Sequence, residues 1–211
     1  MNDLLLDLDG TLIDSTDSIL KSINEVLKKN NIKSSVNLDA KLNGLTLNGI
    51  FNRLFPKYDK DQIDFLINSF KNYYDDYYCT EVYAFPNIPK LLQKLKDSNI
   101  NLYLITNKRM IPTMKILSHL GWTGYFSKVY CIDSYKNECK DKSSLISKLI
   151  YELKLNTNEI FYIGDTEADL KASSDNNIDF IPAFWNPDAL KYDVKMSTEK
   201  YKNFLSFFNK I

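Results

Sequence analysis

The sequence predicts an α/β protein in which a doubly wound parallel sheet is interrupted by an all-helical insertion. Two patterns lead to this prediction. From about residue 86 onward, short apolar segments alternate with longer segments of helical spacing, an order typical of parallel sheets covered by helices on both faces. Between residues 15 and about 82, the apolar residues recur at helical spacing only. The first short apolar run, residues 3–7, must then join the later strands in one sheet.

The elements follow in order along the chain. Helical spacing in the insertion is carried by three groups of residues: Ile19, Ile23, Val26 and Leu27; Leu47, Ile50, Phe51, Leu54 and Phe55; and Phe65, Leu66 and Phe70. The strands expected afterwards are residues 101–105, 127–132, 159–163 and 178–181, and the helices are residues 87–98, 110–120, 143–153 and 166–176. We therefore predict a core formed by residues 1–14 and 86–211 and a helical cap formed by residues 15–85.

Composition limits the classes of partner. With 211 residues, 44% of them hydrophobic, the chain can bury a substantial core. Its 27 basic and 27 acidic residues cancel, which argues against a nucleic-acid partner and favours small molecules. No apolar run approaches the roughly 18 residues of a membrane span, and the three cysteines have no metal-ligand spacing. We expect a soluble cytoplasmic protein, as a monomer or homodimer, with reduced thiols.

Two carboxylates follow the first strand. Asp7 and Asp9 are two residues apart, so they would point to one face if the strand geometry continued. Their like charges would then repel unless a cation lay between them. Oxygen ligands at a strand end suit Mg²⁺, and Mg²⁺ suits phosphate chemistry.

Polar residues also follow the other predicted strands. Because ligands of open parallel sheets bind at the carboxyl ends of the strands, these residues should surround one site. They are Thr106 and Asn107 after the second core strand, Asp165 and Thr166 after residue 163 with Asp169 one helical turn on, and Lys142 before the helix that leads there. Each has an ordinary structural explanation, but together they predict a metal and phosphate site.

The residues of these segments resemble the motifs of the haloacid dehalogenase superfamily. They read DLDGTLID at residues 7–14, ITNK at residues 105–108, a lysine at Lys142, and IGDTEAD at residues 163–169. The resemblance covers nearly the whole chain and implies a Rossmann-like core. The insertion resembles the helical cap of the phosphoglycolate phosphatase-like branch. Lys136 and Lys140 lie close to Lys142, which we prefer as the motif lysine, with Lys140 second.

The resemblance implies a role for each motif residue. Asp7 would attack phosphorus to form an aspartyl-phosphate, and Asp9 would act as general acid and then as general base. Mg²⁺ would be held by the Asp7 carboxylate, the Asp9 main-chain carbonyl and Asp165, with Asp169 either orienting these ligands or joining them. The phosphoryl oxygens would be bound by Thr106, Asn107 and Lys142.

The predicted cap contains two further candidates for substrate binding. Gly44 lies in a predicted loop that matches the substrate-facing cap loop of the resembled branch, and Arg53 follows it. We expect Arg53 either to form a surface ion pair or to bind a second anionic group of the substrate. The tyrosines between residues 73 and 83 are expected to pack helices and the domain junction, with lining of the substrate pocket by one of them as the alternative, and His119 is expected to be structural.

The function predicted by this set is a Mg²⁺-dependent phosphatase of a small phosphorylated metabolite. Three alternatives stay open: a phosphosugar mutase resembling β-phosphoglucomutase, a pyrophosphatase or nucleotidase, and a phosphate-binding protein without turnover. Asp9 argues against a dehalogenase, which has no use for an acid at that position. The retained Asp7 and Asp9 argue against a protein that only binds.

Overall fold

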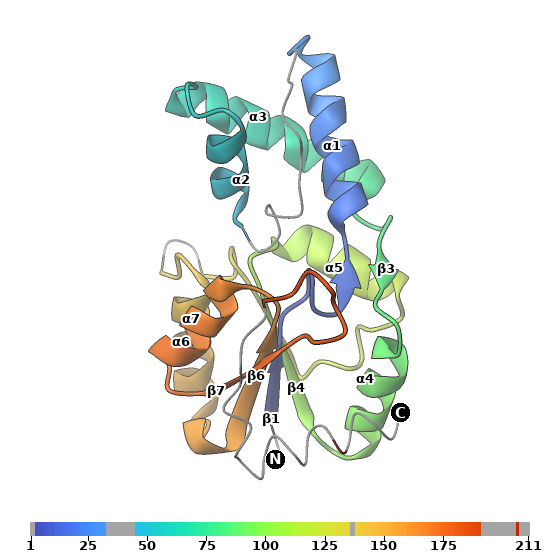
Figure 1. Cartoon of the computed structure of the whole chain (residues 1–211), viewed down its shortest axis with the longest axis vertical. Helices are drawn as coiled ribbons and strands as arrows, with labels where there is room; N and C mark the ends of the chain where they lie inside the picture. The colour runs from blue at the N-terminus through green and yellow to red at the C-terminus, as the bar shows by residue number, and fades with distance from the viewer. Residues whose placement is uncertain (1–2, 33–44, 136–137, 191–205, 207–211) are drawn as a thin grey trace.

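A computed structural model describes residues 3–32, 45–135, 138–190 and 206. The larger of its two parts is built around a five-stranded parallel sheet (Figure 1). The strands, in spatial order, are β5 (Lys128–Cys131), β4 (Asn101–Thr106), β1 (Asp3–Leu6), β6 (Ile160–Gly164) and β7 (Asp179–Pro182). All four neighbouring pairs are parallel. The predicted doubly wound sheet is confirmed, and each strand differs from its predicted bounds by at most one residue at either end.

Helices cover both faces of this sheet. They are α4 (Ile88–Asp97) and α5 (Met110–His119) on one face, and α6 (Lys142–Leu153) and α7 (Glu167–Asp175) on the other. The pleat of β1 shows this division, because successive side chains of a strand point to opposite faces. Leu4 and Leu6 pack with Leu91 of α4, whereas Leu5 packs with Leu145 of α6. Both faces of β1 are therefore buried, as its apolar sequence requires.

A second group of helices forms the upper part of Figure 1. It contains α1 (Thr16–Lys29), α2 (Leu47–Leu54), α3 (Lys60–Tyr73) and η2 (Tyr74–Tyr78), a single π-helical turn that continues α3. These helices share a hydrophobic cluster of their own, centred on Phe51, Leu66 and Phe70. Two short antiparallel strands, β2 (Ile13–Asp14) and β3 (Tyr83–Ala84), lie at the two ends of this group. We call it the cap; the predicted boundaries at residues 15 and 85 stay predictions.

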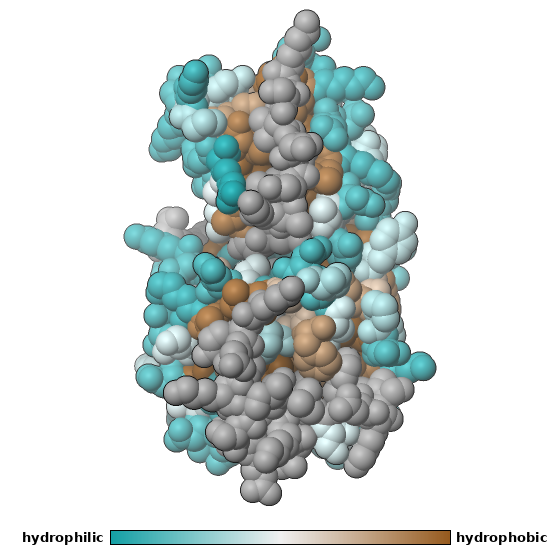
Figure 2. All heavy atoms as spheres, viewed as in Figure 1, coloured by the Kyte–Doolittle hydropathy of each residue, from teal (hydrophilic) through white to brown (hydrophobic). Residues whose placement is uncertain are grey.

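The surface reflects this packing. Figure 2 shows mostly hydrophilic residues on the outer sides of the helices, with hydrophobic residues visible between the cap helices and between the cap and the sheet. No helix in the described part of the chain is both long enough and apolar enough to cross a membrane.

The chain leaves β1 in a tight turn rather than as a continued strand. β1 ends at Leu6, and the backbone amides of Leu12 and Ile13 donate to the carbonyl of Leu8. Gly10 has a positive φ of 78°, and a Cβ there would lie 2.0 Å from Asp165 Oδ2, so only glycine fits. The condition for placing Asp7 and Asp9 on one strand face is therefore not met.

Candidate active site

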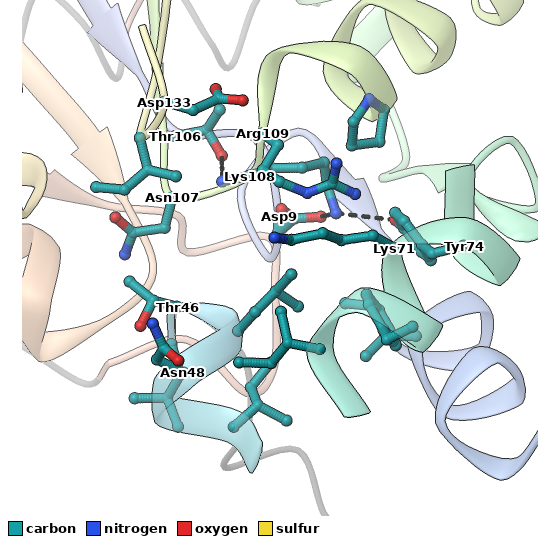
Figure 3. Close-up of a pocket in the computed structure, with 18 of the residues that line it drawn as sticks. Asp9, Thr46, Asn48, Lys71, Tyr74, Thr106, Asn107, Lys108, Arg109 and Asp133 are labelled. Atoms are coloured by element: carbon teal, nitrogen blue, oxygen red, sulfur yellow. Dashed lines mark hydrogen bonds and ion pairs between the residues drawn. The ribbon is translucent and has the colours of Figure 1, made fainter. Parts of the chain in front are cut away.

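The carboxyl ends of the strands meet the cap at a pocket of about 350 Å³ (Figure 3). Its floor comes from the core: Asp7 after β1, Thr106 and Asn107 at the end of β4, and Lys142 at the start of α6. Its other wall comes from the cap, chiefly from α2, α3 and Tyr74. This volume suits a small molecule. The pocket lies where open parallel sheets bind ligands.

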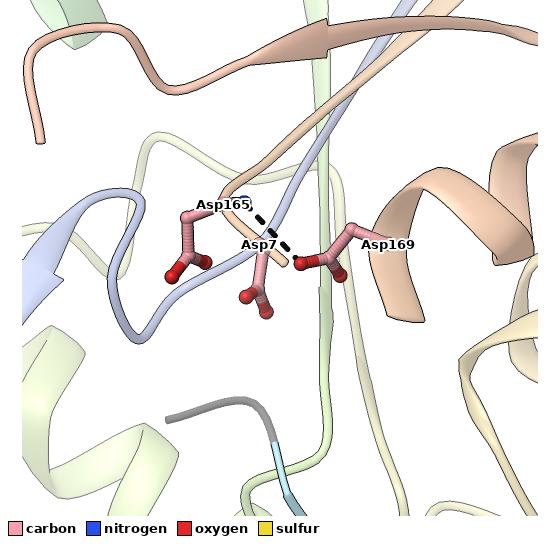
Figure 4. A group of neighbouring side chains, drawn as sticks. All are labelled: Asp7, Asp165 and Asp169. Atoms are coloured by element: carbon pink, nitrogen blue, oxygen red, sulfur yellow. Dashed lines mark hydrogen bonds between the residues drawn. The ribbon is translucent and has the colours of Figure 1, made fainter. Parts of the chain in front are cut away.

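Three buried carboxylates lie together at the floor of the site (Figure 4). One oxygen from each of Asp7, Asp165 and Asp169 lies within 4.8 Å of the others, and none of the three residues is more than 5% exposed. Asp9 is not part of this group. Asp7 and Asp9 line the same pocket, but Asp9 makes its contacts with Ser15 and Lys108 instead of joining the three carboxylates.

Lys142 supplies the positive charge of this cluster. Its side chain is 3% exposed, and its ammonium lies 2.8 Å from Asp7 Oδ2 and 2.5 Å from Asp169 Oδ1. A capping box between Asp141 and Ser144 starts α6 at Lys142, which directs this lysine toward the end of β1. Lys140 is exposed, and Lys136 lies outside the described residues. Of the two candidate lysines that the structure describes, Lys142 is thus the one that contacts Asp7.

Asp169 is saturated by hydrogen bonds. Its Oδ1 accepts from Lys142 and from the Tyr162 hydroxyl at 2.7 Å. Its Oδ2 accepts from the Asp165 amide and from both the amide and the hydroxyl of Thr166, at 2.6 to 3.3 Å. A Cβ at residue 164 would overlap Asp169, so Gly164 permits this approach. With its oxygens occupied, Asp169 is suited to holding Lys142 rather than to binding an ion.

The remaining acceptors fit a divalent cation. Asp7 Oδ1 is buried without a hydrogen-bond partner in the described part of the protein, and Asp7 Oδ2 meets Lys142 only as an ion pair. One oxygen of Asp165 accepts from Thr11 at 3.1 Å. Buried carboxylate oxygens with unused acceptor capacity are the ligands that hard cations such as Mg²⁺ prefer. The donor set at Asp7 and Asp165 therefore fits such an ion.

The pKa values of Asp7, Asp165 and Lys142 show that negative charge exceeds positive charge in this cluster. Burial raises the pKa of Asp7 well above its ordinary value; Lys142 opposes this, and Asp169 and Asp165 add to it. Burial and then repulsion from Asp169 raise the pKa of Asp165 to about 7. Burial disfavours the charge on Lys142, but Asp169 and Asp7 outweigh it and raise its pKa. One ammonium is thus insufficient for three carboxylates, and a bound cation would relieve the repulsion.

The comparisons with known proteins fit this geometry. Residues 4–183 match the model of the haloacid dehalogenase-like hydrolase family. The chain belongs to this family. A phosphoglycolate phosphatase of Psychrobacter arcticus is 30% identical over 83% of this chain and 80% of its own. Pyrophosphatase PpaX of Oceanobacillus iheyensis is 25% identical over 91% of this chain and 92% of its own.

A solved structure confirms the fold. It belongs to a protein described as a predicted phosphatase from Clostridium acetobutylicum, with a TM-score of 0.81, 25% identity, and coverage of 97% of this chain and 98% of that one. The expected membership of the superfamily is therefore confirmed, as is the expectation of an enzyme of its phosphatase type.

Asp9 of this hydrolase contacts the cap side of the pocket. Its Oδ1 accepts from the Ser15 hydroxyl at 2.5 Å and lies 3.1 Å from the ammonium of Lys108. The same ammonium donates to the Tyr74 hydroxyl at 2.8 Å (Figure 3). Next to it, Arg109 makes a bidentate ion pair with Asp75 of η2 at 2.5 and 2.9 Å. Two core residues that directly follow Asn107 therefore hold η2 of the cap.

The other predicted substrate-binding residues are Thr106 and Asn107 of the core and Gly44 and Arg53 of the cap. Thr106, which is buried, and Asn107 line the pocket as expected. Gly44 lies outside the described residues. Arg53 lies on the exposed side of α2 and is not among the residues that line the pocket. The proposed contact of Arg53 with substrate stays a prediction without support from its position.

Three pocket residues were not assigned a role from the sequence. Lys108 lies inside the quoted ITNK segment, so its position next to Thr106 and Asn107 was the available signal. Tyr74 belonged to a tyrosine-rich segment for which packing was the first expectation, with no single tyrosine singled out for the pocket, and Lys71 was one of many lysines without a distinguishing pattern. Their positions depend on how α3 and η2 pack against the core, which local sequence patterns do not encode.

Proposed function

We propose that the protein is a Mg²⁺-dependent phosphatase that hydrolyses a small phosphorylated metabolite through a phosphoryl intermediate on Asp7. The observation that carries this proposal is the buried, unpartnered Oδ1 of Asp7 beside Lys142 at the floor of the pocket. A carboxylate that is desolvated and accessible from a cavity can act as a nucleophile. Phosphoryl transfer asks the protein mainly for in-line positioning and for neutralised charge, which these groups supply.

The residues would act in two steps. First, a carboxylate oxygen of Asp7 bonds to phosphorus while the bond to the leaving oxygen breaks, and protonated Asp9 gives its proton to that oxygen. Second, Asp9 takes a proton from water as the water oxygen bonds to phosphorus and the bond to Asp7 breaks. Inorganic phosphate then leaves, and Asp7 and Asp9 regain their starting states.

The surrounding groups would bind the phosphoryl oxygens. Thr106, Asn107 and Lys142 line the floor beside Asp7 and would hold these oxygens in line with the leaving group. Asp169 would act through Lys142, whose ammonium it positions. Mg²⁺ held by the Asp7 carboxylate, the Asp9 main-chain carbonyl and Asp165 would supply further positive charge to the phosphoryl group.

The names of two relatives support a small phosphorylated substrate. One is a phosphoglycolate phosphatase and another a pyrophosphatase, and both names denote small phosphorylated substrates. We propose a substrate of this kind. A phosphosugar mutase would instead return the phosphoryl group to a sugar, and a binding protein would release nothing.

The test is release of inorganic phosphate from 2-phosphoglycolate, pyrophosphate, ethyl phosphate and glucose 1-phosphate, each with Mg²⁺ or with a chelator. We expect Mg²⁺-dependent release from at least one of the small substrates. Conversion of glucose 1-phosphate to glucose 6-phosphate without release would favour the mutase. Binding without turnover of any compound would favour the phosphate-binding protein, and either result would reject the proposal.

A further inference from the structure

The cap wall of the pocket is mostly apolar, with the neutral polar side chains of Thr46, Asn48 and Tyr74 and the ammonium of Lys71. Its apolar members among the described residues are Ile19, Leu45, Leu47, Ile50, Ile67 and Phe70. The cationic side chain that the cap adds to this wall is Lys71, from the last turn of α3. Figure 3 shows this side chain reaching from the cap helix into the pocket.

Two cations that line the pocket, Lys71 of the cap and the exposed Lys140 of the core, have no ion pair with a carboxylate in the described part of the chain. Lys142 pairs with Asp7, Lys108 with Asp9, and Arg109 with Asp75. Lys71 has no carboxylate within 4.0 Å in the described part of the chain; the contact that the structure records is a long hydrogen bond, 3.4 Å, to the neutral side-chain oxygen of Asn68. It is also half-buried. An ammonium without a counter-charge attracts an anion more strongly than one already paired with a carboxylate does.

The reaction geometry places the leaving group on this side. The phosphoryl group would lie against Asp7, Thr106 and Lys142 at the core floor. In-line transfer puts the leaving oxygen opposite Asp7. The rest of the leaving group must then extend away from the floor, toward the cap wall that carries Lys71.

We propose that Lys71 binds a second anionic group, a carboxylate or a phosphate, carried by the leaving group of the substrate. This inference rests on the proposed function and narrows its substrate class to small phosphate esters or anhydrides with an anionic leaving group. The other polar side chains that the cap adds to the pocket, Thr46, Asn48 and Tyr74, are neutral, so Lys71 is the cationic group that the cap offers to a second anion. Lys71 thus takes the role that the sequence suggested for Arg53, which lies on the outer side of α2.

The first test compares substrates that differ in leaving-group charge. We expect Lys71→Gln to lower kcat/KM for 2-phosphoglycolate and pyrophosphate roughly 10- to 100-fold, the effect of losing a hydrogen bond to a charged group. For ethyl phosphate, whose leaving group is neutral, we expect a change below about threefold. Lys71→Arg should restore part of the loss, since it keeps the charge. Lys60→Gln, at the exposed start of the same helix, is the matched control.

Other outcomes would overturn the inference. An equal loss with ethyl phosphate would mean that Lys71 acts on the phosphoryl group or on folding. A selective loss in Lys140→Gln or Arg53→Gln, with Lys71→Gln unchanged, would assign the second anion to another cation.

A binding measurement separates this inference from the proposed mechanism. Calorimetric titration of Asp7→Asn with 2-phosphoglycolate needs no turnover, so it works even if the protein is not a phosphatase. The double variant Asp7→Asn/Lys71→Gln should bind 2-phosphoglycolate at least about tenfold more weakly and ethyl phosphate about equally. Equal affinity of both proteins for 2-phosphoglycolate would reject the role of Lys71. Full phosphate release by Asp7→Asn alone would reject the mechanism and leave the binding result intact.

Discussion

Lys108 of the core and Tyr74 of the cap contact each other in two ways. The Lys108 ammonium donates to the Tyr74 hydroxyl at 2.8 Å and lies 4.7 Å from the centre of the Tyr74 ring. The same ammonium lies 3.1 Å from Asp9 Oδ1. One buried side chain therefore connects the cap to the residue that we propose as general acid, so the position of η2 bears on the orientation of Asp9.

Replacing Lys108 should affect substrates according to their leaving groups. Lys108→Met removes the partner that orients Asp9, and proton donation matters most when the leaving group is a poor one. We expect at least about a tenfold loss of kcat for ethyl phosphate and a much smaller loss for p-nitrophenyl phosphate. Tyr74→Phe should show the same pattern more weakly, because it keeps the ring. An equal loss for both substrates would show that Lys108 does not act through Asp9.

The Arg109–Asp75 pair should contribute to stability. Both side chains are less than a fifth exposed, and the contact is bidentate. We expect Arg109→Met to lower the free energy of unfolding by about 1–3 kcal/mol in urea denaturation, because it leaves Asp75 without its main partner. The control is Arg53→Met, which replaces an exposed arginine and should change stability by less than about 0.5 kcal/mol. Equal values for the two variants would reject this contribution.

Asp165 and Asp169 should differ in their effect on metal binding. Asp165→Asn removes a proposed ligand, so calorimetric titration should show Mg²⁺ affinity lowered at least about tenfold. Asp169→Asn removes a partner of Lys142, so it should lower kcat roughly 10- to 100-fold with only a small change in Mg²⁺ affinity. A similar loss of Mg²⁺ affinity in both variants would place Asp169 among the ligands instead.

Stability without metal should depend on pH through Asp165. Its pKa is about 7 in the folded protein and near 3.8 in the unfolded chain, so the folded state binds the proton more tightly. The stabilisation from this group is complete below the unfolded pKa and is lost as pH rises through about 7. Mg²⁺ binds the ionised form, so its effect on Tm should grow from about pH 5 to about pH 8.

Thermal unfolding with MgCl₂ or with a chelator measures this dependence. The difference in Tm between the two conditions should be small at the acidic end and larger at the alkaline end, and Asp165→Asn should flatten it. A Mg²⁺ effect that is constant over this range would contradict the raised pKa of Asp165.

Much of the core was predictable because its signals are local. The apolar runs of β1 and β6 and the helical spacing of α4 and α5 fix these elements, and the order of strands and helices fixes the parallel sheet. Asp7, Thr106 and Lys142 follow from their places at strand and helix ends, which meet at one edge. The preference for Lys142 over Lys140 agrees with its contacts to Asp7 and Asp169.

The errors and omissions arise where distant segments meet. The three-carboxylate group contains Asp165 and Asp169 beside Asp7, and Asp9 lies outside it, with Gly10 allowing the close approach of Asp165. Lys71 and Tyr74 belong to the pocket because the end of α3 and the turn of η2 pack over the core. Spacing within α3 and η2 gives no information about that contact.

The central claim is that Asp7 is the nucleophile, and its most direct test is to compare the rates of phosphate release by the wild type and by Asp7→Asn in the presence of Mg²⁺. The control is Asp61→Asn, which changes an exposed aspartate in the same way. The substrate should be the one that wild type hydrolyses fastest. If Asp7 is the nucleophile, Asp7→Asn should lose at least about a thousandfold in kcat while Asp61→Asn keeps the wild-type rate. Phosphate release by Asp7→Asn within about tenfold of wild type would contradict the proposed intermediate on Asp7.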